Sequence, residues 1–235
     1  MTNLGADHAL DPTPASTTNY HVASGGRAVT RDEARQVFGQ VMGLVAVTVA
    51  FAALGSYLGR NLTGGTGIVL FIVAFAGVFA LNSAAARGEE QLAVGLLFGF
   101  GLVLGLAVGP VLAVYAQADP SVLWQAAGAT AAFVALLGAY GYATRRDLSR
   151  WARRLFIAIL ALIAFGIVLL FTSIPGGNLI YAIAGIVIFG AFTIFDFNRL
   201  RRTNPAGVVP IAASIFLDIF NIFLLFIELF SGERN

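Results

Sequence analysis

Two aspartates lie inside apolar stretches of the chain that are long enough to cross a membrane. Asp196 stands in TIFDFNRL, and Asp218 stands in SIFLDIFNIFLLFIELF. A charged side chain at the centre of a membrane helix costs about 2.5–3.5 kcal/mol on insertion scales, so such residues are rare and face protein or water. Both aspartates are therefore candidates for a functional site within the membrane.

The polar side chains near Asp218 share one face of the expected helix. At 100° per residue, Ser214 and Asn221 both lie within about 60° of Asp218. Lipid cannot satisfy a polar stripe on an otherwise apolar helix. The stripe therefore predicts that this face points into the helix bundle.

A short connection, RRTNPAGVVP, makes the helices of Asp196 and Asp218 an antiparallel pair. At about 4 Å and an effective dielectric near 20, two carboxylates repel by about 4 kcal/mol, so we expect them to share one proton. The shared proton would hold the helices together, and its loss would push them apart or capture a cation. Calcium suits such a site because it prefers several oxygen ligands, although two carboxylates alone are an incomplete set.

Structural roles for the two aspartates remain open alternatives. Arg199 follows Asp196 by three residues, the spacing of an ion pair on one helix face. Asp218 could instead hydrogen-bond a neighbouring backbone as a packing device.

The composition is that of an integral membrane protein. Of the 235 residues, 58% are hydrophobic and 11% are charged, whereas soluble domains carry about 25% charged residues. Lysine is absent, which excludes a retinal Schiff base, and cysteine is absent, which excludes disulfides. The net charge of +2 is too small to indicate a nucleic-acid partner.

Seven stretches reach the length of about 20 apolar residues that a membrane helix needs. The sequence therefore predicts an all-α membrane protein with a seven-helix domain over residues 30–231. A capping box formed by Thr30 and Glu33 predicts that the first helix starts at Arg31. The predicted spans are Phe38–Leu58, Gly67–Ala84, Gln91–Ala116, Ser121–Ala143, Arg153–Phe171, Asn178–Asn198 and Val208–Phe230.

Arginines between the spans predict the orientation, because short arginine-rich loops stay in the cytoplasm. Twelve of the fourteen arginines fall on one side, and only Arg60 and Arg234 fall on the other. We therefore expect a plasma (inner) membrane protein with a cytoplasmic amino terminus and an exterior carboxy terminus. Residues 1–29 are expected to form a disordered cytoplasmic tail, and residues 232–235 a short exterior tail.

Glycines in the third span predict close helix packing. Gly101, Gly105 and Gly109 form a ridge at four-residue intervals, and Gly95 and Gly99 form a second small pair. Such ridges let helix backbones approach each other in lipid, where no hydrophobic effect drives association.

Three segments, GYATRRDLS, FDFNRL and FLDIFNIF, resemble in order and spacing the Bax inhibitor motif (TMBIM) family, in particular its bacterial calcium-leak members. The resemblance extends from about Arg35 to the carboxy terminus. It implies a seven-helix fold with the last helix at the centre of the bundle, and a pH-sensitive calcium leak. The paired aspartates of the family match Asp196 and Asp218, and an arginine that can latch onto the pair matches Arg87.

The second span departs from the family pattern. Bacterial leak-type members often carry a glutamate midway along it, and Ala76 stands at about that position. The missing carboxylate weakens the expectation of calcium permeation more than the expectation that the aspartate pair senses protons.

The expected function is a pH-responsive calcium or cation leak, with Asp196 and Asp218 as sensor and gate and no resident cofactor. The alternative is a regulatory membrane protein that acts on a membrane protease or another partner without transport. An aspartyl protease is disfavoured because Leu217 and Ile219, rather than glycine, flank Asp218. A proton-coupled transporter is disfavoured because internal repeats are not visible. We expect a monomer in the lipid bilayer.

Overall fold

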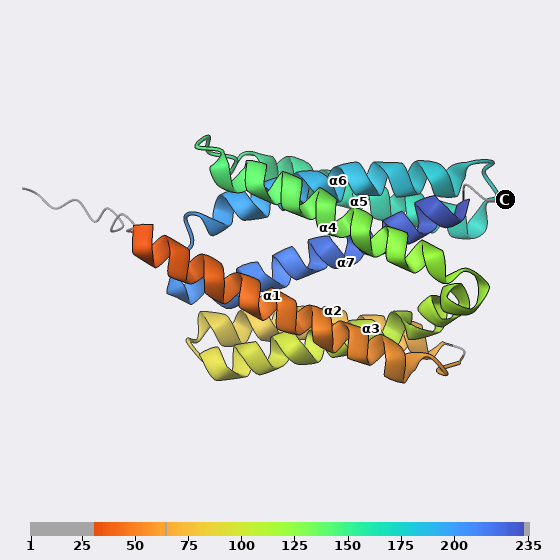
Figure 1. The fold of residues 1–235 in the computed structure, drawn as a ribbon, viewed down its shortest axis with the longest axis horizontal. Coiled ribbons are helices and arrows are strands. Elements are labelled where there is room, and N and C mark those ends of the chain that lie inside the picture. The colour runs from red at the N-terminus through yellow and green to blue at the C-terminus, as the bar shows by residue number, and fades with distance from the viewer. Residues whose placement is uncertain (1–30, 64, 233–235) are drawn as a thin grey trace, which may run out of the picture.

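The computed structural model describes residues 31–63 and 65–232, and helices account for almost all of this part of the chain (Figure 1). A short 3₁₀ helix, η1 (Pro205–Gly207), precedes the last helix. The long helices are α1 (Arg31–Gly59), α2 (Thr66–Ala86), α3 (Glu90–Ala118), α4 (Pro120–Ala143), α5 (Trp151–Phe171), α6 (Gly177–Leu200) and α7 (Val208–Gly232).

All seven long helices have the length and apolar composition needed to cross a membrane. The predicted all-α, seven-span membrane fold is thus confirmed, whereas the predicted capping box involves Thr30, which lies outside the described residues. The predicted tail of residues 1–29 lies outside the described residues. Of the predicted tail 232–235, only Gly232 is described, and it ends α7.

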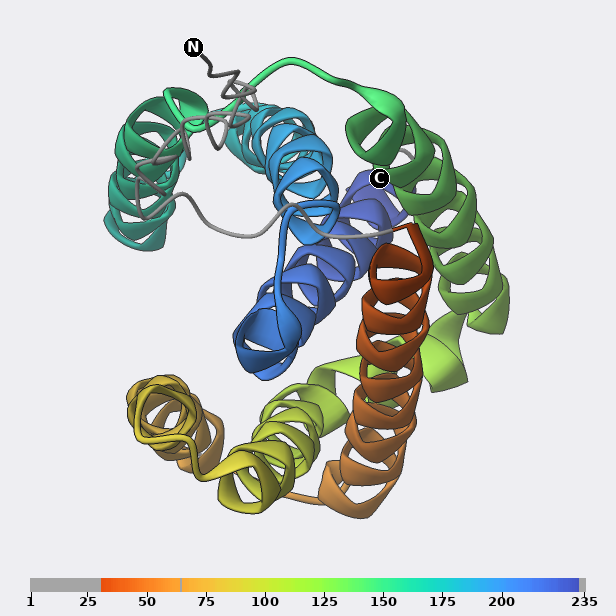
Figure 2. The same cartoon turned by 90° about the vertical axis from the view of Figure 1, so that its left-hand side faces the viewer.

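The last helix lies at the centre of the bundle. Figure 2 shows α7 in the middle, with α6, α4 and α1 around it and with α2 and α3 on one side. In its apolar stretch, 61% of the residues of α7 are buried, against 11% in α5 at the periphery. A polar side chain on α7 can therefore face protein rather than lipid, which is what the stripe around Asp218 requires.

The glycine ridge of α3 packs directly against α1. A Cβ atom on Gly105 would lie 2.0 Å from the backbone oxygen of Ala52, and one on Gly101 would lie 2.7 Å from that of Thr48. At Gly109 a Cβ atom would come within 2.7 Å of the backbone of α1. The close packing predicted for this ridge is confirmed.

The second small pair of α3 does not pack in the same way. Around Gly95 and Gly99, nothing in the described part of the chain lies within 4 Å of an added Cβ atom. The prediction of close packing was wrong here, because four-residue spacing marks a ridge without saying which ridge meets a neighbouring helix.

Substitution of Gly105 by alanine is expected to loosen the α1–α3 interface. The new methyl group cannot fit against Ala52, and overpacking of this kind costs roughly 1–3 kcal/mol. Thermal unfolding in detergent should show a lower midpoint for Gly105→Ala, whereas Gly99→Ala should unfold at or above the wild-type temperature. Equal midpoints for the two variants would contradict the packing described here.

Candidate functional site

Helices α6 and α7 place Asp196 and Asp218 inside the bundle. Each residue is only 4% exposed. The two carboxyl groups lie close enough for the charge of Asp196 to act on Asp218. The structure therefore brings the two sequence-predicted aspartates into electrostatic contact across one helix interface.

Asp218 has an oxygen without a hydrogen-bond partner. Its Oδ2 atom is buried and accepts no hydrogen bond from any described residue. Thr193 lies beside the carboxyl group, but its hydroxyl donates to the backbone oxygen of Phe189 at 2.9 Å. A buried acceptor without a donor is costly, so this oxygen is a place where a proton, a water molecule or a cation would be stabilised.

The other predicted residues of the α6–α7 interface have distinct partners. The Ser214 hydroxyl faces the Asp196 carboxyl group across the interface, and the positive charge of Arg199 attracts that carboxylate from one turn along α6. Asn221 donates its side-chain amide to the backbone oxygen of Leu217 at 2.7 Å. Ser214 and Arg199 thus belong to the surroundings of Asp196, whereas Asn221 satisfies its own helix.

Arg87 does not join the pair, contrary to what the family resemblance implied. Its side chain is 56% exposed, and its Nε atom lies 2.8 Å from Oε1 of Glu89. Its Nη1 atom donates to the Ser83 hydroxyl at 2.7 Å. A carboxylate two residues away satisfies the guanidinium group at the surface, so Arg87 avoids the desolvation that a place beside the buried aspartates would cost.

Ala76 does not face the interior either. It lies on the exposed side of α2, whereas Ala74 is the inward residue at this level, with 2% exposure. Ala76 is therefore not the place where a carboxylate could reach the pair, because residues two apart on a helix point in nearly opposite directions.

A resident calcium ion does not fit the residues present. Within the described part of the chain, no group of three or more acidic, histidine or cysteine side chains is positioned to hold a metal. Calcium takes 6–8 oxygen ligands, and two carboxylates supply at most four of them. The pair is better suited to a transient contact with a cation than to stable binding.

A buried asparagine, Asn198, joins α6 to the end of α4. Asn198 is fully buried, and its amide nitrogen lies 2.8 Å from the backbone oxygen of Thr144. It also reaches the backbone oxygens of Arg146 at 3.2 Å and Gly141 at 3.3 Å. Carbonyl groups at a helix end lack intrahelical partners, and the two N–H groups of this amide are shared among the three oxygens, with Thr144 the nearest.

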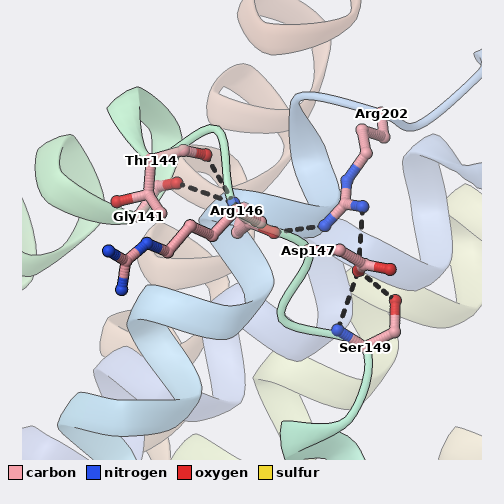
Figure 3. Close-up of polar contacts among 7 residues, drawn as sticks. Gly141, Thr144, Arg146, Asp147, Ser149 and Arg202 are labelled. Atoms are coloured by element: carbon pink, nitrogen blue, oxygen red, sulfur yellow. Dashed lines mark hydrogen bonds and ion pairs between the residues drawn. The ribbon is translucent and has the colours of Figure 1, made fainter.

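Arg202 and Asp147 extend this junction to the surface (Figure 3). Arg202 donates to the Asn198 side-chain oxygen, and its Nη1 atom lies 2.9 Å from Oδ1 of Asp147. The hydroxyl and backbone N–H of Ser149 also donate to Asp147, at 2.5 and 2.9 Å. Hydrogen bonds from Ser149, followed by that from Arg202, lower the pKa of Asp147 to about 2.

The α4–α6 contact is tight as well as polar. A Cβ atom on Gly141 would lie 2.3 Å from the backbone oxygen of Ile194. Helix α6 is therefore held against α4 on one side, while Asp196, two residues beyond Ile194, meets α7 on the other. Asn198, Asp147 and Arg202 were not among the functional positions predicted from the sequence.

Two of the segments that carry the family resemblance, GYATRRDLS and FDFNRL, meet at this junction. The family model described as "Inhibitor of apoptosis-promoting Bax1" matches residues 34–235 of the chain. The chain belongs to the Bax inhibitor family. The match covers all seven membrane-spanning helices.

Proteins similar to this chain occur in bacteria and in a virus. An uncharacterised protein of Deinococcus radiodurans is 25% identical over 215 residues, which cover 85% of this chain and 92% of the relative. A Golgi anti-apoptotic protein of vaccinia virus is 28% identical over 201 residues, 83% of each chain. An uncharacterised membrane protein of Vibrio cholerae is 24% identical over 197 residues, 83% of this chain and 87% of the relative.

Removal of the Asn198 side chain is expected to destabilise this Bax inhibitor family protein. Asn198→Ala leaves the carbonyl groups of Gly141, Thr144 and Arg146 without their donor, at a cost of about 1–3 kcal/mol. Thermal unfolding in detergent should show this loss, and Asn204→Ala, at an exposed position of the α6–α7 connection, should change stability by less than about 0.5 kcal/mol. A wild-type midpoint for Asn198→Ala would exclude the junction as a stabilising element.

Acid is expected to release the α4–α5 connection. The folded-state pKa of Asp147 is depressed to about 2, so its contribution is complete above the ordinary value of about 3.9 and is lost as the pH falls through about 2. Fluorescence of Trp151, at the start of α5, should report the change in a Trp124→Phe background. The variant Asp147→Asn should lack this transition, and an identical transition in that variant would refute the assignment.

Proposed function

We propose that this protein lets calcium or another cation leak across the membrane in a pH-dependent way, with Asp196 and Asp218 as sensor and gate. The observation that carries the proposal is that both carboxyl groups are buried at the α6–α7 interface, near enough for the charge of Asp196 to act on Asp218. Membership of the Bax inhibitor family supports a membrane protein of this kind.

The proposed gate depends on one proton. With the proton shared between the carboxyl groups, α6 and α7 stay together, because repulsion between two full charges is absent. When the proton leaves, the repulsion separates the carboxyl groups or a cation takes the place of the proton. The unpaired Oδ2 atom of Asp218 offers the acceptor that either occupant needs.

The neighbours of Asp196 can stabilise its carboxylate in the ionised form. Ser214 can donate a hydrogen bond to it, and Arg199 supplies a positive charge nearby. These partners would favour Asp196 as the ionised member of the pair and leave the shared proton to the side of Asp218. The Asn198 junction would hold α6 fixed against α4, so that movement occurs at α7.

The protein is proposed to act as a monomer in the plasma membrane, with its amino terminus in the cytoplasm and without enzymatic activity. The arginine asymmetry supports this orientation. The connections α2–α3, α4–α5 and α6–α7, together with the start of α1, lie at one end of the bundle (Figure 1). This arginine-rich end includes Arg35, Arg87, Arg145, Arg146, Arg199 and Arg202.

Calcium flux into liposomes tests the proposal. Liposomes that contain the purified full-length chain should take up calcium at least about tenfold faster at alkaline than at acid pH, a factor equivalent to about 1.4 kcal/mol. The Asp218→Asn variant should abolish this difference in rate. The variant Asp196→Asn should act similarly. Glu90→Gln, which removes an exposed carboxylate at the start of α3, should keep the wild-type pH profile. A calcium flux that changes neither with pH nor with the Asp218 substitution would rule out the gate.

A regulatory role is the second candidate. The viral relative is named as an anti-apoptotic protein, which describes regulation rather than transport. This candidate gains support if the purified protein moves no cation at any pH and reproducibly co-purifies with a membrane protease or another membrane partner. It loses support if flux alone is found.

A further inference from the structure

An apolar groove runs along the bundle between α1 and α4, and its lining does not include Asp196 or Asp218. Its volume is about 1120 Å³, and α7 forms its floor. In Figure 1, α7 is visible between these two helices. The groove residues of α7 are Phe216, Ile219, Phe220 and Phe223.

The α4 wall of the groove is a row of small side chains. Ala127, Ala131, Ala135, Ala139 and Ala143 all line it, at four-residue intervals. A row of methyl groups this long leaves a smooth apolar channel over much of the membrane thickness, roughly 24 Å at 1.5 Å per residue. An occupant of the channel must therefore be long, narrow and apolar.

At the arginine-rich end, the groove has a positive charge. Arg35 lines this end and is exposed, and it forms no ion pair with a side chain that the structure describes. Just below it, Phe38 and Tyr142 meet edge to face with ring centroids 5.1 Å apart, which joins α1 to α4 at this level. The groove is thus apolar along its length and cationic at one end.

We propose that this groove binds an anionic phospholipid, with one acyl chain along the alanine row and the phosphate beside Arg35. An apolar chain with a negative headgroup is the chemical complement of an apolar channel with a cation at its mouth. Basic sites between membrane helices at the cytoplasmic side are known to hold anionic headgroups.

The depth of the groove agrees with an acyl chain. Thr130 lies twelve residues from Tyr142 along α4, about 18 Å at 1.5 Å per residue, and half of the hydrocarbon core is about 15 Å thick. The Thr130 hydroxyl is buried and unpartnered within the described residues, so it ends the purely apolar part of the channel. One chain from the arginine-rich leaflet would fill the channel to this level.

A transmembrane helix of a partner is the competing occupant. Small residues would let such a helix approach closely, and the Thr130 hydroxyl could hydrogen-bond to it. The cation at the mouth favours the lipid, because its charge lies where phosphate groups of the bilayer lie. The Thr130→Val variant distinguishes the two occupants, because it removes a hydroxyl that could hydrogen-bond to a helix but not to an acyl chain.

The experiment uses the full-length chain in phosphatidylcholine nanodiscs that contain a trace lipid with a photoreactive diazirine on its acyl chain. The trace lipid is either phosphatidylglycerol or phosphatidylcholine, and mass spectrometry locates the labelled residues. Phosphatidylglycerol should label groove residues about five times more than phosphatidylcholine, the factor expected from one basic residue near an anionic headgroup. Arg35→Gln should bring the two labels to the same level.

Groove variants provide the matched controls. Ala135→Trp fills the channel and should abolish groove labelling, whereas Leu136→Trp, at a neighbouring position that is 72% exposed and outside the groove, should leave it unchanged. Thr130→Val should also leave labelling unchanged. Because Arg35 is exposed, Arg35→Gln keeps the test valid even if the tryptophan variant does not fold.

Three results would overturn the proposal. They are equal labelling of the wild type by both lipids, undiminished groove labelling in a folded Ala135→Trp variant, and loss of groove labelling in a folded Thr130→Val variant. Labelling that follows Arg35 and Ala135 as described would support it.

Discussion

The arrangement of this bundle depends on one constraint: a carboxyl group inside a membrane must be surrounded by protein. Helix α7 carries Asp218 near its middle, so it must be covered on the side of that residue, and α6 covers it with Asp196, which the Ser214 hydroxyl of α7 also faces. Helices α4 and α1 then cover α7 on its other sides, whereas α5 packs on the outside of α6. In lipid, where no hydrophobic effect draws helices together, α1 and α3 achieve their contact through small residues and close backbone approach.

Helix α6 has a double role that follows from this constraint. One face presents Asp196 to α7, and the opposite face presents Asn198 to the end of α4. Because these residues are two apart, they point in nearly opposite directions. The Asn198 junction and the close contact at Gly141 fix α6 to α4, so charge changes between the aspartates would act chiefly on the position of α7.

The helices, the inward direction of Asp218 and the glycine ridge at Gly105 could all be predicted, because each depends on composition or on periodicity along a single helix. The side-chain contacts between different helices could not be predicted. The location of Asn198 inside a predicted span marked it as unusual, but its spacing does not reveal that it meets the carbonyl groups of α4. The contact of Arg87 with Glu89 could not be predicted for a related reason: the family resemblance pointed to the distant aspartate pair, whereas Glu89 lies two residues away at the surface.

The central claim is that the carboxyl groups of Asp196 and Asp218 are energetically coupled. A double-mutant cycle measures this directly, with the unfolding free energies of the wild type, Asp196→Asn, Asp218→Asn and the double variant in the same bilayer mimetic. At alkaline pH each single substitution should relieve the same repulsion, so the double variant should gain less than the sum by at least about 1 kcal/mol, and the discrepancy should shrink in acid. Additivity within about 0.5 kcal/mol at every pH would contradict the account.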